Sequence, residues 1–340
     1  MLFNSVYFRL KPFIPRAVRM SIRSWCVRRR LPRVRTIWPI MPGSERAPDG
    51  WPGWPKQKKF AFVLTHDVES AVGVDHVNAV ASLETEMGFR SSFNFVPEGP
   101  YSVPRALRSW LVARGFEVGV HDLHHDGHLF ASRAEFSRRA RRINEILREW
   151  GAVGFRSGYM LRNLEWIKEL DISYDASTFD TDPFEPQPDG VDTIFPFWTS
   201  FKGDGQGYIE LPYTMVQDST LFLLLRERGI DLWKRKLDWI ARHGGMVLLN
   251  VHPDYIDFAD GNEALRYPVA RYRELLEYVG KCYGDLAWNA LPRDVAAYCA
   301  AFRPRHPYQT HACASHPKEN AEMQSRWLML SSLLWAKECR

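Results

Sequence analysis

Between Phe60 and Val251, short apolar runs rich in β-branched residues alternate with stretches of helical periodicity. This alternation is the pattern of parallel strands joined by crossover helices, so it predicts an α/β fold. Strands are expected at 60–64, 92–96, 116–120, 153–155, 172–174, 209–211 and 246–251. Helices are expected at 75–87, 104–114, 133–150, 163–170, 221–242 and 268–282. Seven strands with a matching set of helices favour a closed or nearly closed barrel over an open doubly wound sheet.

The first 44 residues differ from the rest in charge. They carry ten Arg or Lys and no acidic residue, whereas the remaining residues carry 35 basic and 40 acidic side chains. Prolines interrupt this segment, so only residues 16–30 could hold a helix. In that helix Val18, Ile22 and Trp25 would share one face, a stripe too thin for a deep core. Trp25 among arginines suits a helix at a membrane interface, and a solvated basic arm fits the sequence equally well.

Three segments are expected: a basic, proline-rich extension over 1–55, a barrel domain over 56–305, and a carboxy-terminal tail over 306–340 that could form one helix. No apolar run of about 7 to 15 residues follows the first charges, so no secretory signal is expected. No segment approaches the roughly 18 apolar residues of a membrane span. Five scattered cysteines without CxxC spacing argue against a disulfide framework or a thiolate zinc site. These features predict a cytoplasmic protein whose residues 1–44 make peripheral contact with an anionic membrane, nucleic acid being a less favoured partner.

Polar residues cluster where three of the expected strands end, which is where α/β barrels place their active sites. The clusters are 65–69, 121–128 and 252–254. Four of the eleven histidines of the chain fall within 121–128. His121 and His125 are four residues apart, so a helical turn would put both on one face, where they could clamp one cation. Nitrogen ligands with a carboxylate suit Zn²⁺, and Co²⁺, Ni²⁺ or Fe²⁺ are alternatives.

The order of these motifs carries a resemblance to a known family. The strings THDVE at 65–69, EVGVHDLHH at 117–125, GFRSGY at 154–159 and LLNVHPD at 248–254 follow one another along the chain. Over residues 60–255 the sequence resembles the polysaccharide deacetylase (NodB-homology) family, in its THDVD-type variant. The resemblance implies a distorted (β/α)7 barrel and metal-dependent hydrolysis of carbon-nitrogen bonds other than peptide bonds.

The resemblance also implies a divalent metal, zinc being the first choice, and its ligands. His121 and His125 match the two histidine ligands of the family, while Asp122 stands in place of a hydroxyl residue. In the first motif Asp67 matches the catalytic base and Glu69 the carboxylate ligand. Because Val68 cannot bind a metal, Asp67 itself remains an alternative ligand.

Three further roles follow from the same resemblance. Arg156 would orient Asp67 and hold it ionised, since a nearby opposite charge depresses a carboxylate pKa. Tyr159 would donate its backbone N–H to the oxyanion, with Gly158 standing where the family has proline. His252 would be the general acid that protonates the leaving amine.

Each assignment has a plainer alternative. Asp67 could cap the helix that follows it, and His252 could be a hydrogen-bonded turn residue. Arg156 could be a surface or ion-pair arginine. Tyr159 could be a packing aromatic.

Three functions are therefore weighed. The first is N-deacetylation of an N-acetylated sugar or glycan precursor, and the second is hydrolysis of a small linear or cyclic amide. The third is a degenerate deacetylase-like protein that binds an anionic membrane or nucleic acid through its basic amino terminus.

Overall fold

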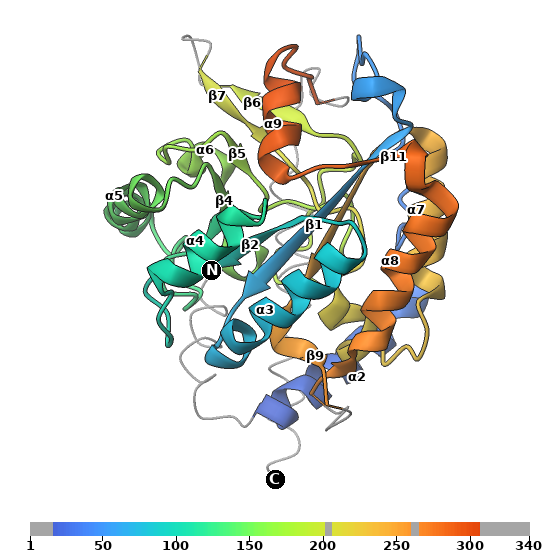
Figure 1. The fold of residues 1–340 in the computed structure, drawn as a ribbon, viewed down its shortest axis with the longest axis horizontal. Coiled ribbons are helices and arrows are strands. Elements are labelled where there is room, and N and C mark those ends of the chain that lie inside the picture. The colour runs from blue at the N-terminus through green and yellow to red at the C-terminus, as the bar shows by residue number, and fades with distance from the viewer. Residues whose placement is uncertain (1–15, 201–205, 260–264, 307–340) are drawn as a thin grey trace.

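The computed structural model describes residues 16–200, 206–259 and 265–306. Its centre is a curled sheet of parallel strands surrounded by helices (Figure 1). In spatial order these strands are β8 (Met246–Val251), β1 (Phe60–Val68), β2 (Ser91–Phe95), β3 (Glu117–His121), β4 (Gly154–Arg156), β5 (Tyr174–Asp175) and β7 (Gly207–Glu210). Beyond β7, the backbone N–H groups of Thr214 and Met215 donate to the Leu248 carbonyl oxygen of β8, both at 3.1 Å. The sheet is thereby nearly closed, which confirms the predicted distorted (β/α)7 barrel.

Four short strands were not expected from the sequence. β6 (Phe197–Ser200) pairs antiparallel with β7, and β11 (Ala287–Asn289) pairs parallel with the first half of β1. β9 (Ile256–Asp257) and β10 (Tyr267–Pro268) form a separate two-stranded sheet. Each has four residues or fewer, too few for a period-2 pattern to be recognised.

Alternation along β1 decides which side chains face the barrel interior. Phe62 and Leu64 belong to the core between the sheet and the helices, whereas Ala61 and Val63 belong to the core inside the barrel. Asp67 follows the same alternation as Ala61 and Val63, so its side chain points into the barrel. His66 instead points outward, where its Nε2 lies 2.6 Å from the buried Glu84 carboxylate.

The helices that follow the strands surround the barrel. Their bounds are α3 (Ala71–Glu86), α4 (Arg105–Ala113), α5 (Arg133–Trp150), α6 (Leu164–Ile167), α7 (Asp231–His243) and α8 (Val269–Tyr283). α5 shows why such segments begin and end where they do: the Ser132 Oγ accepts a hydrogen bond from the Glu135 N–H, and Gly151 ends the helix at φ 64°. The remaining turns are η2 (Pro55–Gln57), η3 (Gly158–Met160), η5 (Pro253–Tyr255) and η6 (Gly284–Leu286).

Two helix predictions need correction. The helix expected over 221–242 is divided into a π-helical segment, η4 (Ser219–Leu224), and α7. Between them Arg226 has φ 62°, a conformation that interrupts a right-handed helix. The helix expected over 163–170 is only α6. In addition, α9 (Pro292–Ala300) was not expected, and it packs beside β6 and β7 at the end of the barrel where the strands begin (Figure 1).

The amino-terminal segment packs against the barrel from residue 20 onwards. α2 (Arg16–Val34) covers the helix expected over 16–30, and its Ser24 Oγ donates to the Leu224 carbonyl oxygen at 2.6 Å in a buried contact. Val27, Val34 and Trp38 join the main hydrophobic core. The alternative of a solvated basic arm is therefore wrong for α2. The helix predicted in the carboxy-terminal tail lies outside the described residues. Among the described residues, no helix combines the length and apolarity that crossing a bilayer requires.

The buried carboxyl group of Glu117 makes the stability of the barrel depend on pH. It accepts hydrogen bonds from the Tyr174 hydroxyl (2.8 Å) and the Arg293 N–H (3.1 Å), but burial outweighs them and raises its pKa from 4.5 to about 7. Between these two values the folded state keeps a proton that the unfolded state has lost. The free energy of unfolding should therefore fall by up to about 3 kcal/mol as the pH rises through this window.

A Glu117→Gln variant cannot titrate at this position. The difference between its unfolding free energy and that of the wild type should shift in favour of the variant as the pH rises from 4.5 to about 7. Urea unfolding at several pH values measures this difference. A constant difference would show that folding does not raise the pKa of Glu117.

Candidate metal centre and catalytic groups

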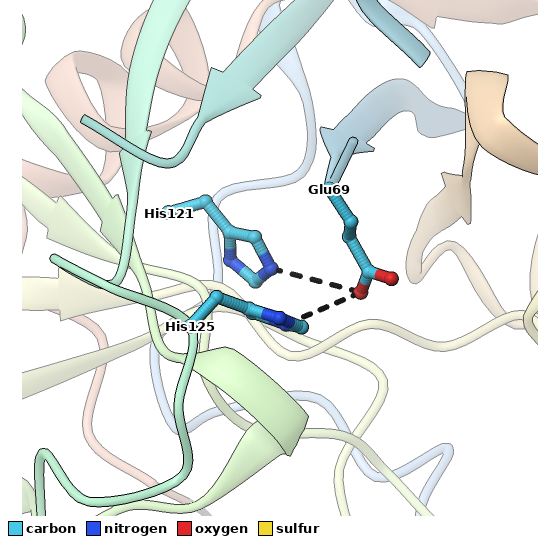
Figure 2. A group of neighbouring side chains, drawn as sticks. All are labelled: Glu69, His121 and His125. Carbon is cyan, nitrogen blue, oxygen red and sulfur yellow. Dashed lines mark ion pairs between the residues drawn. The ribbon is translucent and has the colours of Figure 1, made fainter. Parts of the chain in front are cut away.

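Side chains from the ends of β1, β3 and β8 meet at the carboxyl end of the barrel. Asp67 lies in β1 and Glu69 just beyond its end, His121 is the last residue of β3, and His252 directly follows β8. His125 reaches the same place from the loop after β3 (Figure 2). The structure thus brings together the candidates that the sequence placed in three separate motifs.

Glu69, His121 and His125 form a group that could hold a metal ion, with their ligand atoms all within 4.8 Å of one another. The Glu69 Oε1 lies 3.2 Å from the His125 Nε2 and 4.0 Å from the His121 Nε2 (Figure 2). The His121 Nε2 is buried and has no hydrogen-bond partner among the described residues. A buried nitrogen normally has a partner. An orphaned imidazole nitrogen beside a second imidazole and a carboxylate fits a Zn²⁺-type cation.

Neighbouring groups orient both histidines. The His121 Nδ1 donates to the Arg156 carbonyl oxygen at 3.1 Å, which turns the Nε2 towards Glu69. The His125 ring lies against the Tyr159 ring, with centroids 4.3 Å apart, and the Tyr159 hydroxyl donates to the His125 carbonyl oxygen at 3.1 Å. The hydrogen bond made by the His121 Nδ1 is of the kind that fixes the tautomer of a metal-binding histidine.

The loop between the histidines is not the helical turn that the sequence suggested. Asp122 and His125 have positive φ values, 58° and 52°, which a right-handed helical turn does not allow. Gly158 packs against this loop, and a Cβ at its position would lie 2.6 Å from the Asp122 Oδ2 and 2.9 Å from the His125 Cδ2. A larger residue at this position, proline included, would force the Asp122 and His125 side chains to move.

Asp67 is buried and held on both of its oxygens. The Oδ1 accepts from the Asn94 amide at 3.0 Å and the Oδ2 from the Asn250 amide at 2.8 Å, while the Arg156 Nη1 lies 3.3 Å and 3.4 Å from the two oxygens. Burial alone would raise the pKa of Asp67, but the charges of Arg156, His121 and His252 and the Asn94 hydrogen bond together hold it well below its ordinary value. These neighbours favour the ionised carboxylate, and the side chain does not cap α3, whose N-cap is Ser70.

Glu69 is held differently, with one oxygen left for the histidines. The Tyr255 hydroxyl donates to its Oε2 at 3.2 Å, and its backbone N–H donates to Asp254 at 3.0 Å. Burial raises its pKa, but the neighbouring His125 outweighs this effect and holds the pKa well below the ordinary value. Because both Asp67 oxygens already accept hydrogen bonds, this geometry favours Glu69 over Asp67 as the carboxylate ligand.

His252 forms a buried pair with Asp218, a residue that sequence reasoning missed. The Asp218 Oδ1 accepts from the His252 Nδ1 at 2.7 Å, and its Oδ2 accepts from the His252 backbone N–H at 2.8 Å and from the Tyr267 hydroxyl at 3.0 Å. Burial lowers the pKa of His252, but the Asp218 carboxylate outweighs it and raises the pKa to about 10. The His252 Nε2 lies 3.9 Å from the Glu69 Oε1, so the imidazole faces the candidate metal group.

Arg156 and Tyr159 contact Asp67 and His125, respectively. Arg156 is fully buried and makes the ion pair with Asp67 that was expected, in addition to hydrogen bonds to Thr65 and the Ala176 carbonyl oxygen. Tyr159 packs on His125, in agreement with the alternative that it is a packing aromatic. Its backbone φ is 57°. The oxyanion role of its backbone N–H stays a prediction.

Two further missed residues had a weak sequence signal. Asn250 lies two residues before His252, so it faces the same side of β8, and Asn94 is the register neighbour of Asp67 on β2. Asp218, in contrast, is 34 residues from His252 and lies in no recognisable motif.

Comparisons with known proteins agree with the fold. No protein-family model matches the sequence, and a search of curated proteins gives no significant match. Among solved structures, a candidate polysaccharide deacetylase from Mycobacterium smegmatis matches with a TM-score of 0.57 and 21% identity, covering 80% of this chain and 98% of that one. A 4-alpha-glucanotransferase from Thermococcus litoralis matches with a TM-score of 0.49 and 14% identity, over 72% of this chain and 41% of that one. A peptidoglycan deacetylase from Bacillus subtilis matches with a TM-score of 0.41 and 12% identity, over 72% and 92%. The first of these matches shows that the barrel has the fold of a polysaccharide deacetylase.

Proposed function

We propose that this protein is a metal-dependent hydrolase that removes an acyl group from an amide nitrogen, with an N-acetylated sugar or glycan precursor as its substrate. The convergence of Glu69, His121 and His125 beside an ionised Asp67 and a carboxylate-paired His252 carries the proposal. The polysaccharide deacetylase type of barrel supports the choice of an acetylated carbohydrate. A degenerate site would be expected to lack one of these groups, and the described residues supply all of them.

In this proposal Glu69, His121 and His125 hold a divalent cation, zinc being the first choice. Such a cation polarises an acyl oxygen and lowers the pKa of water. Asp67 is suited to be the base, because Arg156 and two amide donors keep it ionised and fixed in place. It would accept a proton from the water whose oxygen attacks the acyl carbon.

His252 is suited to be the acid at the end of the same reaction. Asp218 accepts a hydrogen bond from the His252 Nδ1 and favours the protonated imidazole. The Nε2 therefore carries a proton on the side of Glu69. As the carbon–nitrogen bond breaks, this proton would pass to the nitrogen, and the products would be a carboxylic acid and an amine. The Tyr159 backbone N–H is the proposed donor to the transient oxyanion.

Metal analysis of a His121→Ala variant tests the proposal. Removing one of the two imidazoles should lower zinc affinity by at least about 100-fold. Loss of a group that only hydrogen-bonds to a metal ligand already lowers the affinity by about 10- to 100-fold. Acetate release from N-acetylated sugars should fall with it, as it should when a chelator is added to the wild type. Simple amides belong in the same assay, since they represent the second candidate substrate class.

His124→Ala is the matched control. His124 lies in the same loop, but its Nδ1 donates to the Glu98 carbonyl oxygen and its ring is not part of the metal group. This variant should keep zinc and turnover. A His121→Ala protein that retains both would rule out the metal centre.

A further inference from the structure

α2 has two distinct faces, and only one of them packs on the barrel. The packed face comprises Met20, Ser24, Val27, Leu31 and Val34. At about 100° per residue, Val18, Ile22 and Trp25 lie on the opposite side of the helix. Their exposed fractions are 48%, 49% and 38%, so α2 presents a ridge of three apolar side chains to solvent. These positions contribute nothing to the core that the helix helps to build.

The same helix is strongly cationic. It contains seven arginines and no acidic residue. The Arg29 guanidinium lies over the Trp25 ring, 4.1 Å from its centroid, so its charge stands beside the apolar ridge. Arg28 and Arg33 are exposed as well. A helix with an exposed apolar stripe flanked by arginines has the composition of helices that lie in the headgroup region of anionic bilayers.

A second group of arginines lies next to η4, the segment on which α2 packs. A pocket between η4 and β10 is lined by Arg226, Arg228, Arg266 and Arg271, with Glu227 as its one acidic lining residue. Its wall includes Phe222 of η4, the segment on which α2 packs through the Ser24–Leu224 hydrogen bond. α2 and this arginine-lined pocket therefore both adjoin η4.

We propose that the exposed face of α2, formed by Val18, Ile22, Trp25, Arg28, Arg29 and Arg33, docks on the surface of an anionic phospholipid bilayer. Charge complementarity and the apolar ridge together select this partner. Phosphates of a nucleic acid would engage the arginines and leave the ridge in water, whereas the headgroup boundary accepts both.

Flotation of the full-length protein with vesicles tests the docking surface. The protein should bind vesicles of phosphatidylcholine mixed with phosphatidylglycerol and should not bind vesicles of phosphatidylcholine alone. The variant Arg28→Gln/Arg29→Gln/Arg33→Gln should bind the anionic vesicles about 100-fold more weakly, from about fivefold for each charge. The variant Val18→Ser/Ile22→Ser/Trp25→Ser, which changes exposed positions only, should lose at least about tenfold.

Matched substitutions elsewhere on the surface provide the controls. Val112→Ser/Leu286→Ser changes exposed apolar residues, and Arg105→Gln/Arg141→Gln/Arg235→Gln removes the same charge from other helices. Both control variants should bind anionic vesicles like the wild type, and all α2 variants should hydrolyse a soluble substrate at the wild-type rate. Equal binding to both kinds of vesicle, wild-type binding by the serine variant, or binding of duplex DNA in place of vesicles would each overturn the proposal.

Discussion

An Asp67→Asn variant should lose about 100-fold to 10,000-fold in kcat, the range typical of removing a general base. The amide cannot accept the proton of the attacking water. It also leaves the buried Arg156 without its counter-charge, so the protein should lose about 3 kcal/mol in unfolding free energy. Acetate release, urea unfolding and zinc content measure the three consequences.

Zinc content separates the two roles weighed for Asp67. If Glu69 is the ligand, Asp67→Asn should retain its zinc while losing activity. Thr65→Val is a suitable control, because it removes another hydrogen bond from the Arg156 Nη1 without touching the carboxylate, and it should keep most of its activity. If Asp67→Asn kept its fold but lost its zinc, the result would identify Asp67 as the ligand in place of Glu69.

An Asp218→Asn variant should lose about 100-fold or more in kcat with little change in KM. The buried imidazole of His252 loses the carboxylate that favours its protonated form, and burial then favours the neutral form. A smaller fraction of His252 is then protonated and able to donate to the leaving nitrogen. No contact with the substrate is removed. Steady-state kinetics with a soluble N-acetylated substrate gives the split between kcat and KM, and circular dichroism checks the fold.

Tyr267→Phe is the control for this prediction. It removes one hydrogen bond to Asp218 and leaves the His252–Asp218 pair intact, so its loss in kcat should be about tenfold or less. If Asp218→Asn turned over at the wild-type rate, His252 would not be the acid.

The barrel could be predicted because its strands carry their own signal. Buried parallel strands such as β1 and β8 are continuous apolar runs, and a polar cluster at the end of each marks the carboxyl edge of the sheet. Breaks that depend on single backbone conformations could not be predicted. The division of the expected 221–242 helix at Arg226 and the non-helical loop between Asp122 and His125 are examples.

What the sequence by itself determined is the order of the elements and the identity of the polar residues at the strand ends, because both follow from local periodicity and from motifs within a few residues. Only the tertiary structure decided which partner each side chain has. Asp218 reaches His252 across 34 residues, and Asn94 and Asn250 approach Asp67 from two different strands. Likewise, the Tyr255 bond to Glu69 leaves one oxygen for the histidines. These contacts arise when segments distant in the chain become neighbours in the nearly closed barrel, and no local sequence pattern specifies which segments will meet.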